Sequence, residues 1–274
     1  MTHQSLVKPP LVMGIVNVTP DSFSDGGRHA TAEAALVHAL KLIEQGADVL
    51  DVGGESTRPG SDPVDEAEEI ARVAPLIAEI RARWDGRISI DTMKPAVARA
   101  AVVAGATMWN DVTALNHAPD SLATAAELGC EVVLMHMKGA PKTMQDDPRY
   151  DDVVAEVVAF LAARAEAAVA AGIAREKIWL DPGIGFAKTT AHNLMLTARL
   201  GALVDLGFPV LYAASRKRLI QGVDAAAIEA GDRLGGSLAL ALEGGRRGAR
   251  MVRVHDVRET VQALKLQAGV TAAG

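Results

Sequence analysis

Polar side chains stand at the ends of a series of short apolar runs in this sequence. Each run is rich in Val, Ile and Leu, and the residues that end the runs are Asn17, the Glu55–Arg58 region, Asp91, Asn110, His136, Asp181, Ser215–Lys217, Arg253 and His255. A carboxylate accepts two parallel hydrogen bonds from a ring edge with adjacent N–H groups, and an amide matches a neighbouring donor and acceptor. Arginine and lysine bind phosphate groups. These residue types suit a small polar ligand that also carries negative charge.

The apolar runs alternate with helical stretches along the chain. Helices are expected between them, among them helices near 31–45, from Asp65 to Arg83 and over roughly 257–268. Continuous apolar runs that alternate with helices predict a parallel sheet covered by helices. Eight such units predict an α/β fold, a single (β/α)8 TIM-type barrel domain over residues 1–274. The expected strands lie within residues 11–18, 47–54, 87–92, 107–112, 131–137, 177–183, 208–215 and 249–256.

The polar residues gather at one end of these expected strands. The opposite ends, near Leu11, Phe208 and Ala249, carry little polar chemistry. In a (β/α)8 barrel the active site is built on the C-terminal rim. A barrel without a site would scatter polar residues over both rims, and a single strand-end aspartate such as Asp181 serves equally well as a turn or cap residue. The asymmetry therefore favours an active site on the C-terminal rim.

The composition excludes several classes of protein. The 274-residue chain has a net charge of −6, which does not predict a basic surface for nucleic acid or for an anionic membrane. No apolar run is long enough to span a bilayer and the first residues lack the apolar core of a signal peptide, so a cytoplasmic location is expected. The single cysteine, Cys130, is expected to be a packed core thiol, and the histidines lack the spacing of a zinc site.

Seven segments of the chain resemble the motifs of dihydropteroate synthase, in order and over nearly the whole length. They are NVTPDSFSDGG (17–27), DVGGESTRPG (51–60), SIDT (89–92), NDV (110–112), DPGIGF (181–186), SRK (215–217) and RVHD (253–256). That family joins 6-hydroxymethyl-7,8-dihydropterin diphosphate to p-aminobenzoate and releases diphosphate. The resemblance implies a transferase (EC 2.5.1.15) of folate biosynthesis, Mg²⁺ as cofactor, a homodimer and sensitivity to sulfonamides. Two positions depart from the usual motifs, since Ala187 stands where GFGKT is common and Ala213 where Gly often precedes Ser-Arg-Lys.

Strand-end residues are expected to bind the pterin ring, in agreement with the resemblance. Asp181 accepts two hydrogen bonds from the ring edge with Asn110 beside it, Asp91 accepts from the opposite side, and Lys217 donates to the ring carbonyl and N5. Met135 either packs on the face of the pterin or belongs to the core. His136 is expected to be a hydrogen-bonded histidine beneath the site, with no ligand contact.

The diphosphate is expected at the ends of the last two strands, where such barrels often hold phosphate. Arg253 and His255 alternate with two valines, so both should point to the same side of their strand. The resemblance adds Asn17, as a ligand of Mg²⁺ beside the diphosphate, and Arg58 as a further diphosphate contact. Lys217 would thus bind the pterin and Arg253 the diphosphate.

The p-aminobenzoate pocket follows from the resemblance, which assigns it to Thr57, Arg58, Pro59, Phe186, Ser215 and Lys217. Three of these residues lie in the segment ESTRPG (55–60). This segment and VNVTPDSFSDGG (16–27) are polar and rich in Gly and Pro, and each is expected to act as a lid. A long solvent-exposed turn is the alternative for the second of them.

The expected reaction needs charge stabilisation more than a general base, because an aromatic amine attacks without prior deprotonation. The catalytic residues would be Asp91, Lys217, Arg253 and His255, acting on a dissociative substitution through a pterin cation. Two alternatives share the fold. One is a methyltransferase that moves a methyl group from methyltetrahydrofolate to a corrinoid protein, and the other is a pterin-binding paralogue without turnover. Residues for a diphosphate site argue against both.

Overall fold

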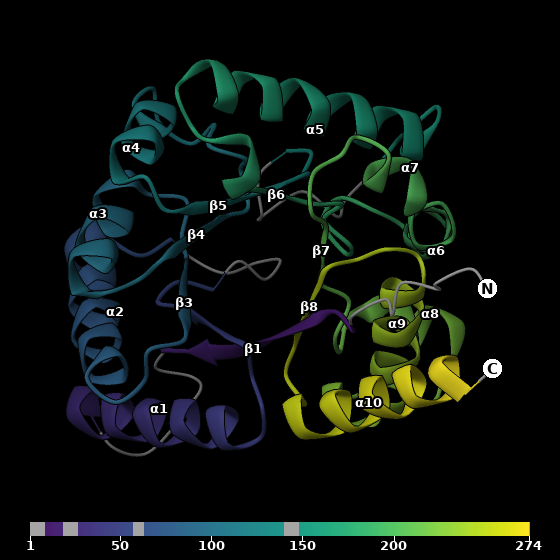
Figure 1. Cartoon of the computed structure of the whole chain (residues 1–274), viewed down its shortest axis with the longest axis horizontal. Coiled ribbons are helices and arrows are strands. Elements are labelled where there is room, and N and C mark those ends of the chain that lie inside the picture. The colour runs from purple at the N-terminus through teal and green to yellow at the C-terminus, as the bar shows by residue number, and fades with distance from the viewer. Residues whose placement is uncertain (1–8, 19–26, 57–62, 140–147, 274) are drawn as a thin grey trace.

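Eight parallel strands form the centre of the computed structural model, which describes residues 9–18, 27–56, 63–139 and 148–273. Each expected apolar run contains one strand. The strands are β1 (Leu11–Asn17), β2 (Val49–Gly53), β3 (Arg87–Asp91), β4 (Met108–Asp111), β5 (Glu131–Met135), β6 (Ile178–Asp181), β7 (Leu211–Tyr212) and β8 (Met251–Val254). They follow the order β6-β5-β4-β3-β2-β1-β8-β7, and helices surround them (Figure 1). The predicted (β/α)8 barrel is confirmed.

The barrel closes weakly between β6 and β7. A single parallel bridge joins Leu180 to Val210, and the amide of Leu180 donates to the carbonyl of Pro209 over 2.9 Å. β7 has two residues, whereas the run expected there covers 208–215. Proline lacks an amide hydrogen and cannot donate to a sheet, which limits pairing at the start of this run.

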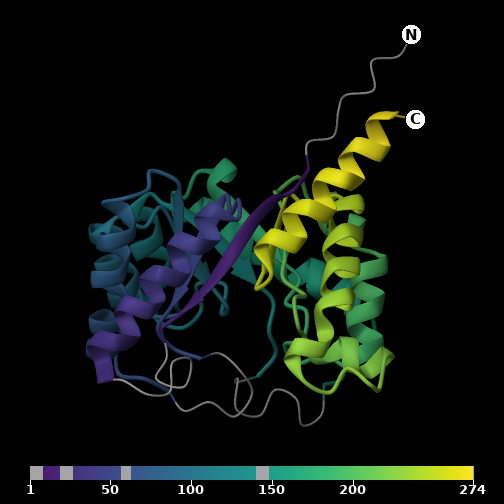
Figure 2. The same cartoon turned by 90° about the horizontal axis from the view of Figure 1, so that it is seen from below.

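Helices cover the outside of the sheet. They are α1 (Gly27–Glu44), α2 (Glu66–Arg81), α3 (Pro95–Ala104), α4 (Ser121–Leu128), α5 (Val153–Ala170), α6 (Thr190–Ala198), α7 (Gly201–Val204), α8 (Arg218–Val223), α9 (Leu234–Arg246) and α10 (Val257–Ala273), with 3-10 turns η2 (Arg175–Lys177) and η3 (Ala230–Arg233). A side-chain cap fixes where α5 begins. Asp152 accepts hydrogen bonds of 2.9 and 3.0 Å from the amides of Val154 and Ala155. The start of β1 and the end of α10 lie on the same side of the molecule (Figure 2).

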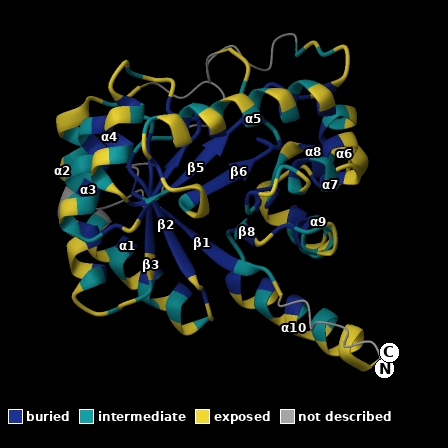
Figure 3. Cartoon of the chain, turned by 45° about the horizontal axis from the view of Figure 1, so that its top comes forward, coloured by how far each residue is buried: buried dark blue, intermediate teal, exposed yellow. Residues whose placement is uncertain are grey.

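Side-chain alternation along the strands separates two apolar cores. Residues such as Val12, Leu50 and Val252 pack against the helices, in the larger core. The second core fills the barrel interior and consists of Met13, Val49, Met108, Val133, Trp179, Leu211 and Met251. Most strand residues are buried, and exposed residues lie on the outward faces of the helices and in the connections (Figure 3).

Two sequence-based expectations about the rest of the chain can be compared with this fold. Cys130 is buried, and burial raises the pKa of its thiol to about 11, as expected for a core residue. Within the described part of the chain, every helix is too short or too polar to cross a bilayer.

Candidate active site

A polar layer lies directly above the apolar core of the barrel interior. Two residues beyond Val49, Met108, Trp179 and Met251, four alternate strands present Asp51, Asn110, Asp181 and Arg253. Because side chains alternate along a strand, a step of two residues keeps the same inward direction. Layers of four side chains from alternate strands are the usual filling of this barrel. Here the layer nearest the C-terminal rim is polar, which marks the rim as a place for ligand chemistry.

Arg253 lies between two carboxylates, one in the middle of β2 and one at the end of β3. Its Nε donates to Asp51 Oδ2 over 2.6 Å and its Nη2 donates to Asp91 Oδ2 over 2.7 Å. The valines on either side, Val252 and Val254, belong to the outer core, so Arg253 points inward. Arg253, expected at the diphosphate, thus contacts Asp91, expected at the pterin, so the residues assigned to the two ligands form one ion-pair group.

Asp51 was not among the residues assigned from the sequence. Its side chain is fully buried, and besides Arg253 it contacts Asn110, whose Nδ2 donates to Asp51 Oδ2 over 3.2 Å. Asp51 thereby orients both Asn110 and Arg253. A signal was present in the sequence, because an aspartate in the middle of the apolar run ADVLDVGG is costly to bury without a partner.

Burial changes the protonation of the two assigned carboxylates. It raises the pKa of Asp91 from 3.8 to about 7, against the opposing effect of Arg253. It also raises the pKa of Asp181 from 3.8 to about 6, while the amide of Gly183, which donates to Asp181 Oδ1 over 2.7 Å, lowers it. Asp91 Oδ1 is buried without a protein hydrogen-bond partner, as is Asp51 Oδ1. Buried acceptors of this kind are available to a ligand that brings donors.

The loop after β6 is held by Lys188, a buried lysine that the sequence-based assignment missed. Nζ of Lys188 contacts Nδ1 of His136 at 3.0 Å and donates to the carbonyls of Gly183 and Phe186 over 3.1 and 3.0 Å. Burial lowers the pKa of Lys188 to about 7 and that of His136 to about 3. His136 is therefore a neutral acceptor for Lys188 and has the hydrogen-bonded, structural surroundings expected for it.

Phe186, in this loop, lies next to both Lys217 and Met135. Nζ of Lys217 sits 4.2 Å from the centre of the Phe186 ring, and Phe186 packs with Met135 in a small apolar cluster. The charge of Lys217 also acts on both Asp91 and Asp181, lowering the pKa of each. The assigned lysine therefore interacts electrostatically with both assigned carboxylates.

Ser215 and His255 contact each other directly. The Ser215 hydroxyl accepts from the amide of His255 over 3.2 Å and lies 3.0 Å from its Nδ1. Burial and the nearby Arg253 lower the pKa of His255 to about 3, so the imidazole is neutral. If the hydroxyl hydrogen goes to Nδ1, Nε2 carries the remaining ring proton and is a neutral donor. In that tautomer His255 presents a neutral N–H donor at Nε2.

The remaining assigned residues are placed less completely. Asn17 ends β1, in register with Gly53, which itself is in register with Asp91. Thr57, Arg58 and Pro59 lie outside the described residues, as do residues 19–26 of the other expected lid.

Comparison with known proteins identifies the family. A model of the pterin binding enzyme family matches residues 13–255. Dihydropteroate synthase of Escherichia coli K12 is 48% identical over 257 residues, 94% of this chain and 90% of that protein. The chain belongs to the dihydropteroate synthase family. Two structures of the Xanthomonas albilineans enzyme are also similar: one with 4-aminobenzoic acid (TM-score 0.91, 52% identity, 97% of this chain and 94% of that one) and one with 7,8-dihydropteroate (0.87, 48%, 97% and 95%).

One departure from the usual dihydropteroate synthase motifs has a visible backbone consequence. Ala187 adopts a positive φ of 51°, a conformation that glycine tolerates better. The neighbouring Gly183 also has a positive φ, and a Cβ there would meet the carbonyl oxygen of His136 at 1.9 Å. The loop keeps its close approach to β5 despite the alanine. Ala213, the other departure, is buried and takes no positive φ.

The donor set on the rim fits the Mg²⁺ that the dihydropteroate synthase resemblance implies. Among the described residues, no three His, Cys, Asp or Glu side chains are grouped to hold a metal by themselves. Asn17 offers a single amide oxygen at the rim, and Mg²⁺ commonly takes its other ligands from substrate phosphates and water.

Proposed function

We infer that this protein condenses 6-hydroxymethyl-7,8-dihydropterin diphosphate with p-aminobenzoate to give 7,8-dihydropteroate and diphosphate, the reaction EC 2.5.1.15 of folate biosynthesis. One observation carries this function to named residues. The charge of Lys217 acts on two buried carboxylates, Asp91 on β3 and Asp181 on β6, at the C-terminal rim of a barrel that belongs to the dihydropteroate synthase family. This arrangement suits a ring with donors on two edges and an acceptor between them.

The pterin ring is assigned to the polar layer. Asp181 accepts from the ring N–H and 2-amino groups, since one of its oxygens already accepts from Gly183 and is fixed in direction. Asn110 lies on β4, beside β3, and is oriented by Asp51. Asp91, on β3, accepts from the reduced side of the ring. Met135, packed against Phe186, supplies an apolar face. Lys217 donates to the carbonyl and N5.

The diphosphate is assigned to the ends of β1 and β8. Arg253 supplies charge and His255 a hydrogen bond, and Asn17 would hold the Mg²⁺. When bound there, the ion neutralises negative charge on the leaving group. Arg58 is proposed as a further diphosphate contact.

The p-aminobenzoate pocket is assigned to Thr57, Arg58, Pro59, Phe186, Ser215 and Lys217. Of these, Phe186 and Lys217 are in contact through the ring face. The Xanthomonas albilineans enzyme with 4-aminobenzoic acid supports a pocket for this compound in the family. Sulfonamides, one of which is bound in a structure of the Yersinia pestis enzyme, are expected to occupy the same pocket.

The reaction breaks the bond between the pterin methylene carbon and the diphosphate oxygen and forms a C–N bond to the arylamine. Charge develops on the pterin as the diphosphate leaves, and the Asp91 carboxylate stabilises it when ionised. Arg253 links the pterin part of the site to the diphosphate part, because it contacts Asp91 and is itself assigned to the diphosphate. The proton lost by the amine goes to diphosphate or water.

The assembly and domain assignments complete the proposal. We expect a homodimer, as the family resemblance implies, and a single domain over residues 1–274. Diphosphate release from the two substrates tests the activity. Release that requires both substrates is the expected result. No release, with normal pterin binding, would favour a paralogue without turnover, and methyl transfer from methyltetrahydrofolate would favour the corrinoid methyltransferase.

A further inference from the structure

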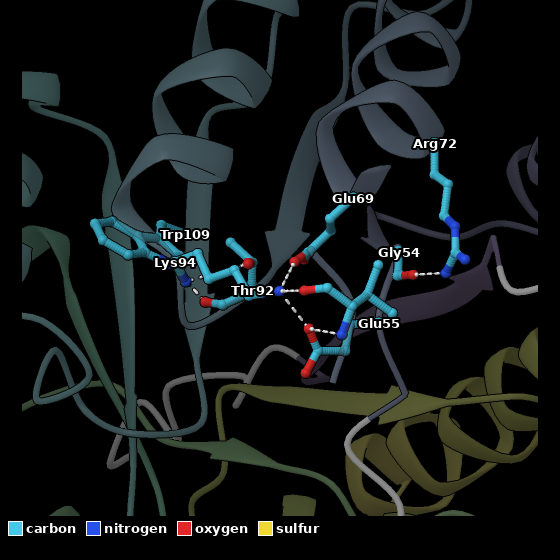
Figure 4. A network of polar contacts seen from close by, with 8 residues as sticks. Gly54, Glu55, Glu69, Arg72, Thr92, Lys94 and Trp109 are labelled. Atoms are coloured by element: carbon cyan, nitrogen blue, oxygen red, sulfur yellow. Dashed lines mark hydrogen bonds and ion pairs between the residues drawn. The ribbon is translucent and has the colours of Figure 1, made fainter. Parts of the chain in front are cut away.

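Lys94 lies at the centre of a buried polar network between β2, α2 and α3. Its Nζ donates to Glu55 Oε2 over 2.5 Å and to Glu69 Oε2 over 2.8 Å, and it also donates to the carbonyl of Val64. Figure 4 shows these three contacts meeting at the ammonium group. The Lys94 side chain is 10% exposed and that of Glu69 is 1% exposed. All three hydrogens of the ammonium therefore have acceptors in a dry environment.

Two of these acceptors stand at opposite ends of one connection. Glu55 comes two residues after β2, and Val64 comes two residues before α2. Glu55 Oε2 also accepts from the amide of Val64, at 3.3 Å. Lys94 thus ties the entry and the exit of the β2–α2 connection to each other and, through Glu69, to the first turn of α2.

The entry of the connection is fixed from a second side. The carbonyl of Gly54 accepts from Nη1 of Arg72 over 2.8 Å, and a Cβ on Gly54 would lie 2.7 Å from a methyl group of Val73. Gly54 therefore lies directly against α2. Since two independent contacts fix the backbone here, the direction in which the connection leaves β2 is determined.

Lys94 also belongs to the segment that follows Asp91. Its amide donates to Oγ1 of Thr92 over 3.2 Å, and the carbonyl of Thr92 accepts from Nε1 of the buried Trp109 over 2.7 Å. The end of β3, which positions Asp91, is thereby rigidly joined to the residue that holds the β2–α2 connection. Burial alone would lower the pKa of Lys94, but the hydrogen bonds that it donates to Glu55 and Glu69 raise this pKa above 10.5, so the group stays charged.

We propose that Lys94 is a positioning residue that fixes both ends of the β2–α2 connection relative to Asp91, and so sets the p-aminobenzoate side of the site against the pterin side. It touches neither substrate. The proposal rests on the proposed function, because it takes the residues between Glu55 and Val64 to contribute to the p-aminobenzoate pocket. The expected effect is selective: a variant without Lys94 should use p-aminobenzoate less well and bind the pterin diphosphate normally.

The test compares Lys94→Met and Glu55→Gln with the matched control Lys177→Met. Lys177 precedes β6 at the opposite rim and donates to the carbonyl of Gly129. Lys177→Met therefore removes the same positive charge at a place away from the site. In both network variants KM for p-aminobenzoate should rise about tenfold or more, as expected when a reactant is misplaced by an ångström or so. The dissociation constant of the pterin diphosphate should stay within about twofold, as should both constants in the control.

Two further readouts separate positioning from a general loss of structure. The double variant should be no worse than Lys94→Met alone, because Glu55→Gln weakens an ion pair that Lys94→Met already removes. Hydrogen exchange at the amide of Val64 should quicken in Lys94→Met, since its acceptor Glu55 loses its partner. Glu55 lies at the edge of the network, 11% exposed, so Glu55→Gln carries the test if Lys94→Met fails to fold.

The outcomes decide the proposal in either direction. Equal losses for both substrates, unchanged KM for p-aminobenzoate, or unchanged exchange at Val64 would each overturn it. An unaltered chain without synthase activity would instead refute the proposed function, while exchange at Val64 would still report whether Lys94 fixes the connection.

Discussion

Replacing Arg253 with methionine should reveal the cost of two buried carboxylates that lose a shared cation. Arg253 Nε and Nη2 lie 2.6 and 2.7 Å from Asp51 and Asp91, and the Asp51 side chain has no exposed surface. Removing one partner of a buried ion pair destabilises a protein by about 3–5 kcal/mol, because the other charge stays buried. We expect a loss of this size at pH 8.

The loss should shrink at lower pH, and its sign follows from Asp91. Its pKa in the folded protein is about 7, raised by burial above 3.8, and Arg253 holds it down. Without Arg253 this pKa rises further, so between pH 7 and 8 the folded variant binds a proton that the folded parent does not. Over that one pH unit the free energy of unfolding of the variant falls by about 1.4 kcal/mol, while that of the parent changes little. The destabilisation should therefore be smaller by about this amount at pH 6 than at pH 8.

Urea unfolding at the two pH values measures both quantities. Arg83→Met is the control, because Arg83 and Glu79 form an exposed pair whose side chains are 46% and 56% exposed. That change should cost about 1 kcal/mol or less at either pH. Adding Asp51→Asn to Arg253→Met removes one of the two unpaired charges, and the cycle should show a coupling of about 1–3 kcal/mol. A loss below about 1 kcal/mol at pH 8, or an equal loss at both pH values, would refute the reasoning.

Four further predictions concern ligands. Asp181→Asn should weaken pterin binding by about 2–4 kcal/mol, because one acceptor becomes a donor facing donors, and near-normal affinity by calorimetry would remove Asp181 from this role. In the unaltered protein pterin affinity should fall as the pH drops through about 6, where Asp181 takes up a proton. p-Aminobenzoate should bind better with Mg²⁺ and diphosphate than without, with a coupling of about 1–3 kcal/mol that Arg58→Ala largely removes; two equal titrations would contradict this. Sulfonamides should lose potency as p-aminobenzoate rises, and inhibition independent of its concentration would exclude a shared pocket.

The sequence by itself determined the barrel and the rim on which the site lies. Apolar runs such as RISID and MWND are local patterns, and a strand forms wherever such a run can be buried under helices. Residues at the ends of these runs must reach one rim, since all parallel strands point the same way. For the same reason the inward direction of Arg253 followed from its alternation with Val252 and Val254.

The tertiary structure decided which side chains meet. Arg253 and Asp51 are 202 positions apart, and their contact exists because β1 pairs with both β2 and β8. Sequence-based assignment gave Arg253 to the diphosphate and did not pair it with Asp51. The buried position of Asp51 in an apolar run indicates that it needs a partner, but no local pattern says which residue across the barrel that partner is. The same holds for Lys94, whose acceptors Glu55 and Glu69 come from other units of the fold.

Protonation was also decided by the fold. His255 was assigned as part of the diphosphate site beside cations, yet it is neutral because burial and Arg253 lower its pKa to about 3. Asp91 and Asp181 differ from ordinary aspartates for the same reason, since removal from water penalises the charged form. A side chain's type is written in the sequence, but its charge depends on burial and on neighbours that only the closed barrel brings within range.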